Sequence, residues 1–128
     1  NGNSRFLVPT QNAAAMAKLQ PILSKEELEA MITSEDVKTG KWIREENQRK
    51  QTYRELIGSG DRKKIMRMVH TLYRHKADQS ASGRKIHLCD ENFLHDAEKL
   101  LIGEISIVLH LEPEQARDYI HKKLKEDA

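Results

Sequence analysis

A chain of 128 residues, 38% of them hydrophobic and 33% charged, is long enough to bury a core and is typical of one soluble globular domain. It holds no apolar run near the ~20 residues of a membrane-spanning helix, and its start lacks the basic and apolar regions of a signal peptide. The single cysteine, Cys89, excludes an internal disulfide framework and fits a reducing cytoplasm.

The net charge of +2 is unevenly distributed along the chain. Residues 38–85 carry fourteen Lys or Arg against five Asp or Glu, residues 1–37 carry three against five, and residues 86–128 carry five against ten. A basic centre between acidic ends is expected when one surface faces a polyanion. The alternative is a solvated helical surface that is rich in lysine and arginine.

The first predicted elements are short. Residues 5–9 (RFLVP) predict an extended segment with no later strand to pair with, so it either packs on helices or belongs to an upstream domain. Residues 13–17 predict a single helical turn. Ser24 and Glu27 have the spacing of a capping box. The helix that they open places three apolar side chains on one face, Leu28, Met31 and Ile32.

Two helices are predicted in the basic centre. A polar linker over residues 33–40 precedes the first, from about 41 to 57, which Gly58-Ser59-Gly60 ends. Asp61 is a good N-cap for the second, from about 62 to 76. Four of its side chains, at spacings i, i+4, i+7 and i+11, predict a continuous basic stripe: Lys63, Arg67, His70 and Arg74. The stripe suits phosphate contact better than base readout, and a solvated helix face is the alternative.

The last third of the chain is also predicted to be helical. Residues 77–85 are polar and contain Ser, Ala and Gly, which predicts a flexible loop. The longest helix follows from about 89 to 110, with an apolar stripe wide enough for two neighbours. Pro113 suits the first turn of a last helix that reaches about Leu124. The expected fold class is all-α, a compact bundle of about five helices with a short extended N-terminal segment.

Patterns for catalysis and metal binding are absent from the sequence. The six histidines form no H-E-x-x-H and no i, i+4 pair, and the chain has no C-x-x-C and no phosphate-binding glycine loop. A lone cysteine without a matched base is typical of an unreactive filler. We therefore expect no enzyme activity, no metal site and no cofactor.

Six ordered groups of residues carry a family resemblance. They are VPTQNA with LQPILS at 8–13 and 19–24, GKWIR at 40–44, SGD at 59–61, VHTLYR at 69–74, FLHDAEKLL with GEI at 93–101 and 103–105, and EPEQA at 112–116. Together they resemble the helical domain of CarD/CdnL-type bacterial transcription regulators, over nearly all of the chain.

The resemblance implies a role in transcription initiation. Members of this family bind RNA polymerase through an N-terminal Tudor-like domain, and their helical domain contacts promoter DNA near the upstream edge of the bubble. In the family, a tryptophan wedges into the minor groove and stabilises the open complex without reading a specific sequence. By position, this tryptophan would be Trp42. Residues 1–12 would be the last strand and junction of a largely missing polymerase-binding domain, and residues 13–128 the DNA-binding domain. The expected DNA contacts are Lys41, Trp42, Arg44, Arg49, Lys63, Arg67 and Arg74.

Trp42 is the only tryptophan, and its predicted place is the start of a helix. Lys41, Arg44 and the helix N-terminus can hold phosphates on either side of the ring. A buried core anchor is the alternative, because most tryptophans are highly buried. The chain departs from the family pattern at Glu45 and Glu46, where basic residues are common, and over residues 79–85, which are longer and more polar than the usual turn of the family.

A second hypothesis comes from a different functional class. The chain would be a helical protein–protein adaptor whose acidic C-terminal helices dock a partner, supported by the acidic balance of residues 86–128. We expect a monomeric bacterial protein in the cytoplasm, associated with the nucleoid if it binds DNA. Pairing of residues 5–8 with a second copy stays open, as do the target promoters and the sign of regulation.

Overall fold

A computed structural model describes residues 22–125, and these form a helical bundle. The described part contains five α-helices: α2 (Lys25–Ile32), α3 (Glu46–Ser59), α4 (Arg62–Ala81), α5 (Leu88–Leu109) and α6 (Pro113–Ile120). Two short elements complete it, the 3-10 helix η1 (Glu35–Lys38) and the π-helical turn η2 (His121–Lys125). The all-α fold class is confirmed. The predicted extended segment, the helical turn at 13–17 and the proposed domain boundary lie outside the described residues.

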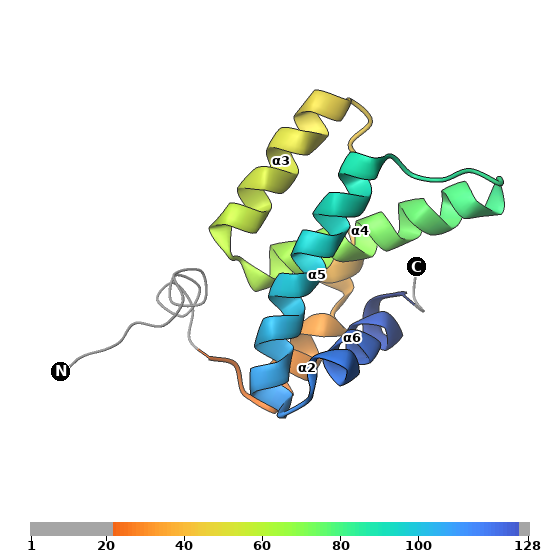
Figure 1. Cartoon of the computed structure of the whole chain (residues 1–128). Coiled ribbons are helices and arrows are strands. Elements are labelled where there is room, and N and C mark those ends of the chain that lie inside the picture. The colour runs from red at the N-terminus through yellow and green to blue at the C-terminus, as the bar shows by residue number, and fades with distance from the viewer. Residues whose placement is uncertain (1–21, 126–128) are drawn as a thin grey trace.

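The bundle is organised around α5, which α4 crosses (Figure 1). Helix α3 lies at one end of this pair, whereas α2 and α6 lie at the other. Apolar side chains from α2, α4, α5 and α6 fill the space between them, and each fully buried one contributes roughly 1.5–3 kcal/mol of transfer free energy. The most buried include Leu28, Ile65, Leu72, Leu101, Ile105 and Ile120.

Three helix boundaries agree with the sequence. The Ser24 hydroxyl accepts a hydrogen bond from the Glu27 backbone N–H at 3.0 Å, and the Glu27 carboxylate accepts one from the Ser24 N–H at 2.8 Å. Asp61 caps α4 by accepting from the Lys64 N–H at 3.1 Å. Gly60 ends α3 with φ of 69°, a left-handed conformation that glycine adopts without steric cost.

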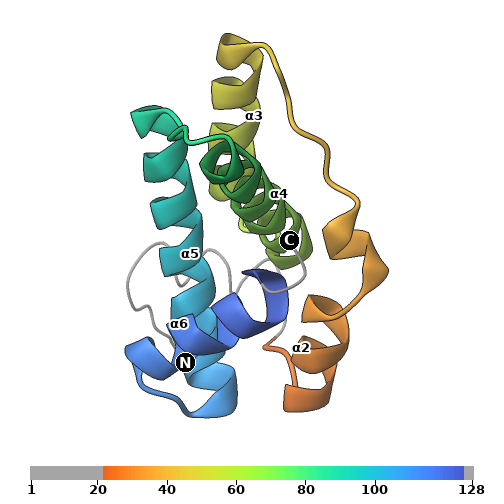
Figure 2. The ribbon, with the colours of Figure 1, turned by 90° about the vertical axis from the view of Figure 1, so that its right-hand side faces the viewer.

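The predicted start of α3 at residue 41 was wrong. The helix begins at Glu46, because the Glu45 carboxylate acts as its N-cap and accepts from the backbone N–H groups of Asn47 and Gln48 at 3.1 and 2.8 Å. Residues 41–45 therefore belong to a connection rather than to a helix, and Figure 2 shows this connection rising from α2 to α3. Trp42 consequently lies ahead of the helix and not in its first turn.

The predicted loop over residues 77–85 is also shorter in the structure. Helix α4 continues to Ala81, since residues 77–81 contain no helix breaker, and Gly83 ends the turn with φ of 74°. The last helix is confirmed up to Leu124, although its final turn has π geometry. None of the helices described between residues 22 and 125 is long and apolar enough to cross a membrane.

Candidate nucleic-acid interface

The connection over residues 33–45 lies along one side of α4. Near its start, Asp36 pairs with Lys63 at 2.6 Å and its backbone carbonyl accepts a hydrogen bond from Arg67 Nε at 2.9 Å. Further along, Gly40 packs against Thr71. The connection thus follows α4 in the same direction and leads to Trp42 near the helix's last turns.

Gly40 is required by this close approach. A Cβ atom at this position would overlap with Thr71 Oγ1 and Arg67 Cγ. We expect Gly40→Ala to lower the free energy of unfolding by about 1–3 kcal/mol, as measured by urea denaturation. Thr71→Ala removes the obstructing oxygen, so the double variant should regain part of the loss. Gly58→Ala is the matched control, because a Cβ there meets open space; an equal loss in both glycine variants would contradict the packing argument.

Trp42 is half-buried and held by two neighbouring side chains. Its ring stacks on the His75 imidazole with 3.5 Å between ring centroids and 8° between planes. The Arg49 guanidinium carbon lies 4.4 Å from the ring centroid, a cation–π distance. The ring packs against the core and also lines a surface cleft, so it is neither a fully buried anchor nor a freely exposed wedge.

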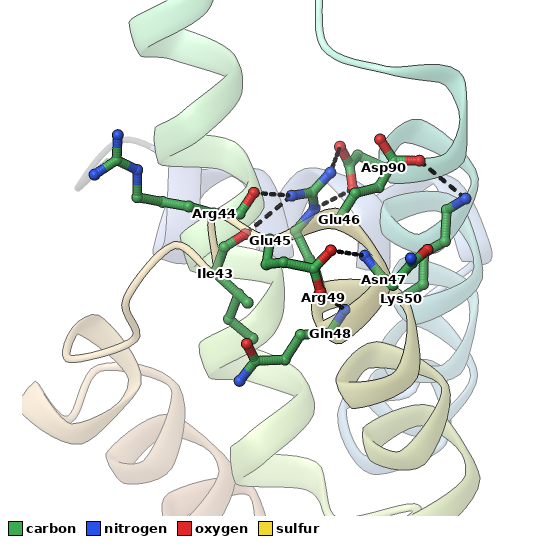
Figure 3. Close-up of polar contacts among 9 residues, drawn as sticks. All are labelled: Ile43, Arg44, Glu45, Glu46, Asn47, Gln48, Arg49, Lys50 and Asp90. Atoms are coloured by element: carbon green, nitrogen blue, oxygen red, sulfur yellow. Dashed lines mark hydrogen bonds and ion pairs between the residues drawn. The ribbon is translucent and has the colours of Figure 1, made fainter.

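Arg49 fixes the end of the connection that carries Trp42. Its guanidinium makes two parallel bonds to Asp90 on α5, from Nε to Oδ1 at 2.8 Å and from Nη2 to Oδ2 at 3.1 Å (Figure 3). Nη1 donates to the backbone carbonyls of Ile43 at 2.9 Å and Arg44 at 3.4 Å. One side chain therefore joins α3, α5 and residues 43–44. Such a forked arrangement suits the planar guanidinium.

This placement corrects the expectation for Arg49. Its side chain is only 3% exposed and its donors are directed to Asp90 and to backbone carbonyls, so the structure gives it a positioning role rather than a phosphate contact. The sequence contained the two partners of this ion pair, an arginine within a predicted helix and an aspartate near the start of another. Their separation of 41 residues concealed the pairing.

The basic stripe on α4 is not a continuous exposed face. His70 is buried at 2% exposure, because it faces the bundle interior. Lys63 and Arg67 are partly covered by the connection and engaged by Asp36, and the Lys63 ammonium holds the pKa of the Asp36 carboxyl below its usual value. Arg74 is exposed, whereas Lys63 and Arg67 have intermediate exposure. Helical periodicity correctly predicted that these residues follow one another along α4. It could not predict that η1 packs against part of that face.

Lys41 and Arg44 are exposed on either side of Trp42 in the connection, and Arg74 is exposed on α4 one residue before His75, on which the ring stacks. Figure 3 shows the Arg44 side chain pointing away from the Arg49–Asp90 pair. The model of the CarD C-terminal domain matches residues 27–121, which include this whole region. The chain belongs to the CarD family. None of the curated proteins and none of the solved structures gives a match.

The family match gives this CarD domain a role related to transcription regulation. It begins at Glu27 within α2 and ends just after α6, so the family resemblance is confirmed over the motif groups between residues 40 and 116. Among residues 22–125, no group of three or more His, Cys, Asp or Glu side chains is placed to hold a metal ion.

A cleft of about 220 Å³ beside the tryptophan was not foreseen from the sequence. It lies between the connection, the last turns of α4, the first turn of α3 and the start of α5. We call it the Trp42 cleft, and it is lined by Trp42, Arg44, Glu46, Arg49, His75, Gln79 and His87. Because these residues come from separate elements, no local pattern could have brought them together.

Proposed function

We propose that this CarD domain binds promoter DNA at the backbone and minor groove, near the upstream edge of the transcription bubble, and stabilises the RNA polymerase open complex. The binding is largely independent of sequence, and the role is not enzymatic. RNA polymerase is the proposed second partner, engaged by a polymerase-binding domain of the family type.

The observation that supports this proposal most is the presentation of Trp42 between two exposed cations. Lys41 and Arg44 are exposed one residue before and two residues after Trp42 in the chain, and the buried Arg49–Asp90 pair holds the backbone of the same segment. A large apolar ring at the surface can wedge between base steps of distorted DNA, whereas flanking cations bind phosphates. A positioned wedge gains affinity because the segment is ordered before DNA binds.

Long cationic side chains explain why the base sequence of the DNA should matter little for binding. Contacts from lysine and arginine to phosphate oxygens fix the position of a protein on DNA but carry no direct sequence information. The surface proposed for these contacts contains Lys41, Arg44 and Arg74, with Lys63 and Arg67 at its edge where Asp36 already engages them. Arg49 is not part of this surface.

The adaptor hypothesis is weakened by internal pairing of the acidic residues. Asp90 pairs with Arg49, Glu91 with Lys76 at 3.2 Å, and Glu104 with Arg62. Glu98 accepts a hydrogen bond from Tyr73 and lies 3.3 Å from His121. Much of the acidic excess after residue 85 is thus neutralised within the bundle, and less of it remains to attract a basic partner.

Neutralising the exposed cations tests the DNA surface. We expect Arg44→Gln and Arg74→Gln each to weaken DNA binding similarly on unrelated sequences, and to reduce the salt slope by about 1 for each phosphate that the variant no longer binds. Fluorescence anisotropy at several salt concentrations measures both quantities.

Lys99→Gln is the matched control for this experiment. Lys99 is exposed in the middle of α5, so its substitution removes the same charge far from Trp42 along the helix. The proposal predicts that this variant keeps nearly the wild-type slope. Equal slopes for all three variants would show that the contacts lie elsewhere or that only net charge matters.

A further inference from the structure

The lining of the Trp42 cleft contains two charges that are already neutralised. Glu46 pairs with Lys50 at 3.0 Å, and Arg49 pairs with the fully buried Asp90. Neither leaves a net charge for a ligand to meet. The character of the cleft is therefore decided by its other polar residues.

Those other residues are one cation, two imidazoles and the amide of Gln79. Arg44 and His87 are exposed, and His75 is partly covered by the tryptophan ring on which it stacks. His87 is the N-cap residue of α5, but its side chain makes no capping hydrogen bond. In the described part of the chain, no carboxylate forms an ion pair with any of the three. The cleft thus offers donors for an anion, and its one lining carboxylate, Glu46, lies near His87 but is paired with Lys50.

We propose that the Trp42 cleft binds one phosphate group of the DNA backbone through Arg44, His75 and His87, and that the two histidines take up protons as it binds. This inference rests on the proposed function, because it assigns a particular phosphate contact to the same surface. The cleft volume of about 220 Å³ is several times the roughly 30 Å³ that one liquid water occupies, so it has room for such a group.

The surroundings of His75 favour the neutral imidazole before DNA binds. Burial lowers its pKa, and the positive charge of Arg49 and the nearby His87 act in the same direction. Asp90 and Asp78 raise the pKa but do not overcome these effects. A phosphate in the cleft adds a negative charge beside both imidazoles, which favours their protonated forms.

The sign of the effect follows from proton linkage. Above the pKa of the bound state, a histidine is neutral with or without DNA and adds nothing to affinity. As the pH falls between the bound and free pKa values, each histidine strengthens binding by up to about tenfold per pH unit. Below the free pKa the gain is complete. The phosphodiester keeps its charge throughout this range, so the change reports on the protein.

Anisotropy binding of the whole chain to labelled fork DNA, from about pH 5.5 to 8 at constant ionic strength, tests this site. Affinity should rise as the pH falls. His87→Gln should reduce that dependence, and it should leave the fold intact because His87 is exposed, which thermal melting by circular dichroism checks. His95→Gln, an exposed histidine on α5 outside the cleft, should keep the full dependence.

Binding that does not change with pH, or changes equally in wild type and His87→Gln, overturns the inference while the DNA-binding proposal stands. NMR of the histidine rings without DNA distinguishes failure of this site from failure of the DNA-binding proposal. Sulfate, compared with chloride at equal ionic strength and fixed pH, should shift the ring resonances of His75 and His87 but not those of His95. This result supports the site even if DNA binding fails, and no shift at either histidine refutes it.

Discussion

Arg49→Met is expected to lower the free energy of unfolding by about 3–5 kcal/mol. Asp90 has no exposed surface, and Arg49 supplies both hydrogen bonds that its carboxylate receives across the α3–α5 contact. The methionine variant leaves that carboxylate buried without a partner and withdraws a donor from the Ile43 carbonyl. Urea denaturation followed by circular dichroism measures the loss.

Lys50→Met is the matched control for this substitution. Lys50 is the next residue of α3 and pairs with Glu46 one turn away, but both side chains are substantially exposed. Removing such a pair should cost no more than about 0.5 kcal/mol. Adding Asp90→Leu to Arg49→Met should restore much of the stability, because no buried charge then remains. Similar small losses for Arg49→Met and Lys50→Met would mean that the buried pair does not hold this end of the bundle.

Trp42→Ala is expected to weaken binding to fork-junction DNA by about tenfold to a hundredfold, since stacking of an aromatic ring on a base contributes about 1–3 kcal/mol. Binding to intact duplex should fall less, because phosphate contacts from Lys41 and Arg44 remain. Anisotropy titrations on the two DNA forms give the ratio of the affinity for fork-junction DNA to the affinity for duplex DNA. Because the ring also packs on the core, thermal melting must show that the variant is folded.

Two further variants separate a wedge from a general apolar contact. Trp42→Phe keeps a flat ring and should retain part of the junction preference. Ile107→Ala removes an apolar side chain that is 64% exposed on α5, and it should change neither affinity. An equal loss on duplex and junction DNA for Trp42→Ala would contradict a wedge and would favour a role in holding the connection on α4.

Local chemistry allowed much of the fold to be predicted. The ends of α2 and α4 were predictable because capping depends on neighbouring residues, as at Ser24 and Asp61. The apolar periodicity of α4 and α5 likewise identified buried positions such as Ile65 and Leu101. The start of α3 was mispredicted, because the sequence did not identify Glu45 as the residue whose side chain caps the helix.

The candidate site was less predictable because it depends on tertiary contacts. Family resemblance indicated Trp42, but only the fold shows that His75 stacks on it and that Arg49 and Asp90 hold its segment. Periodicity likewise predicted the basic stripe on α4 without showing that η1 covers one edge and that His70 faces inward. Which side of a helix remains exposed is decided by its neighbours, and those are distant in sequence.

We propose that this CarD domain binds DNA through the phosphate backbone without reading the base sequence. The most direct test is the affinity of the chain for two fork-junction DNAs of unrelated sequence over a series of salt concentrations. We predict equal affinities for both DNAs and a steep linear fall of log affinity with log salt concentration. No binding at low salt, or a strong preference for one of the two sequences, would contradict the claim.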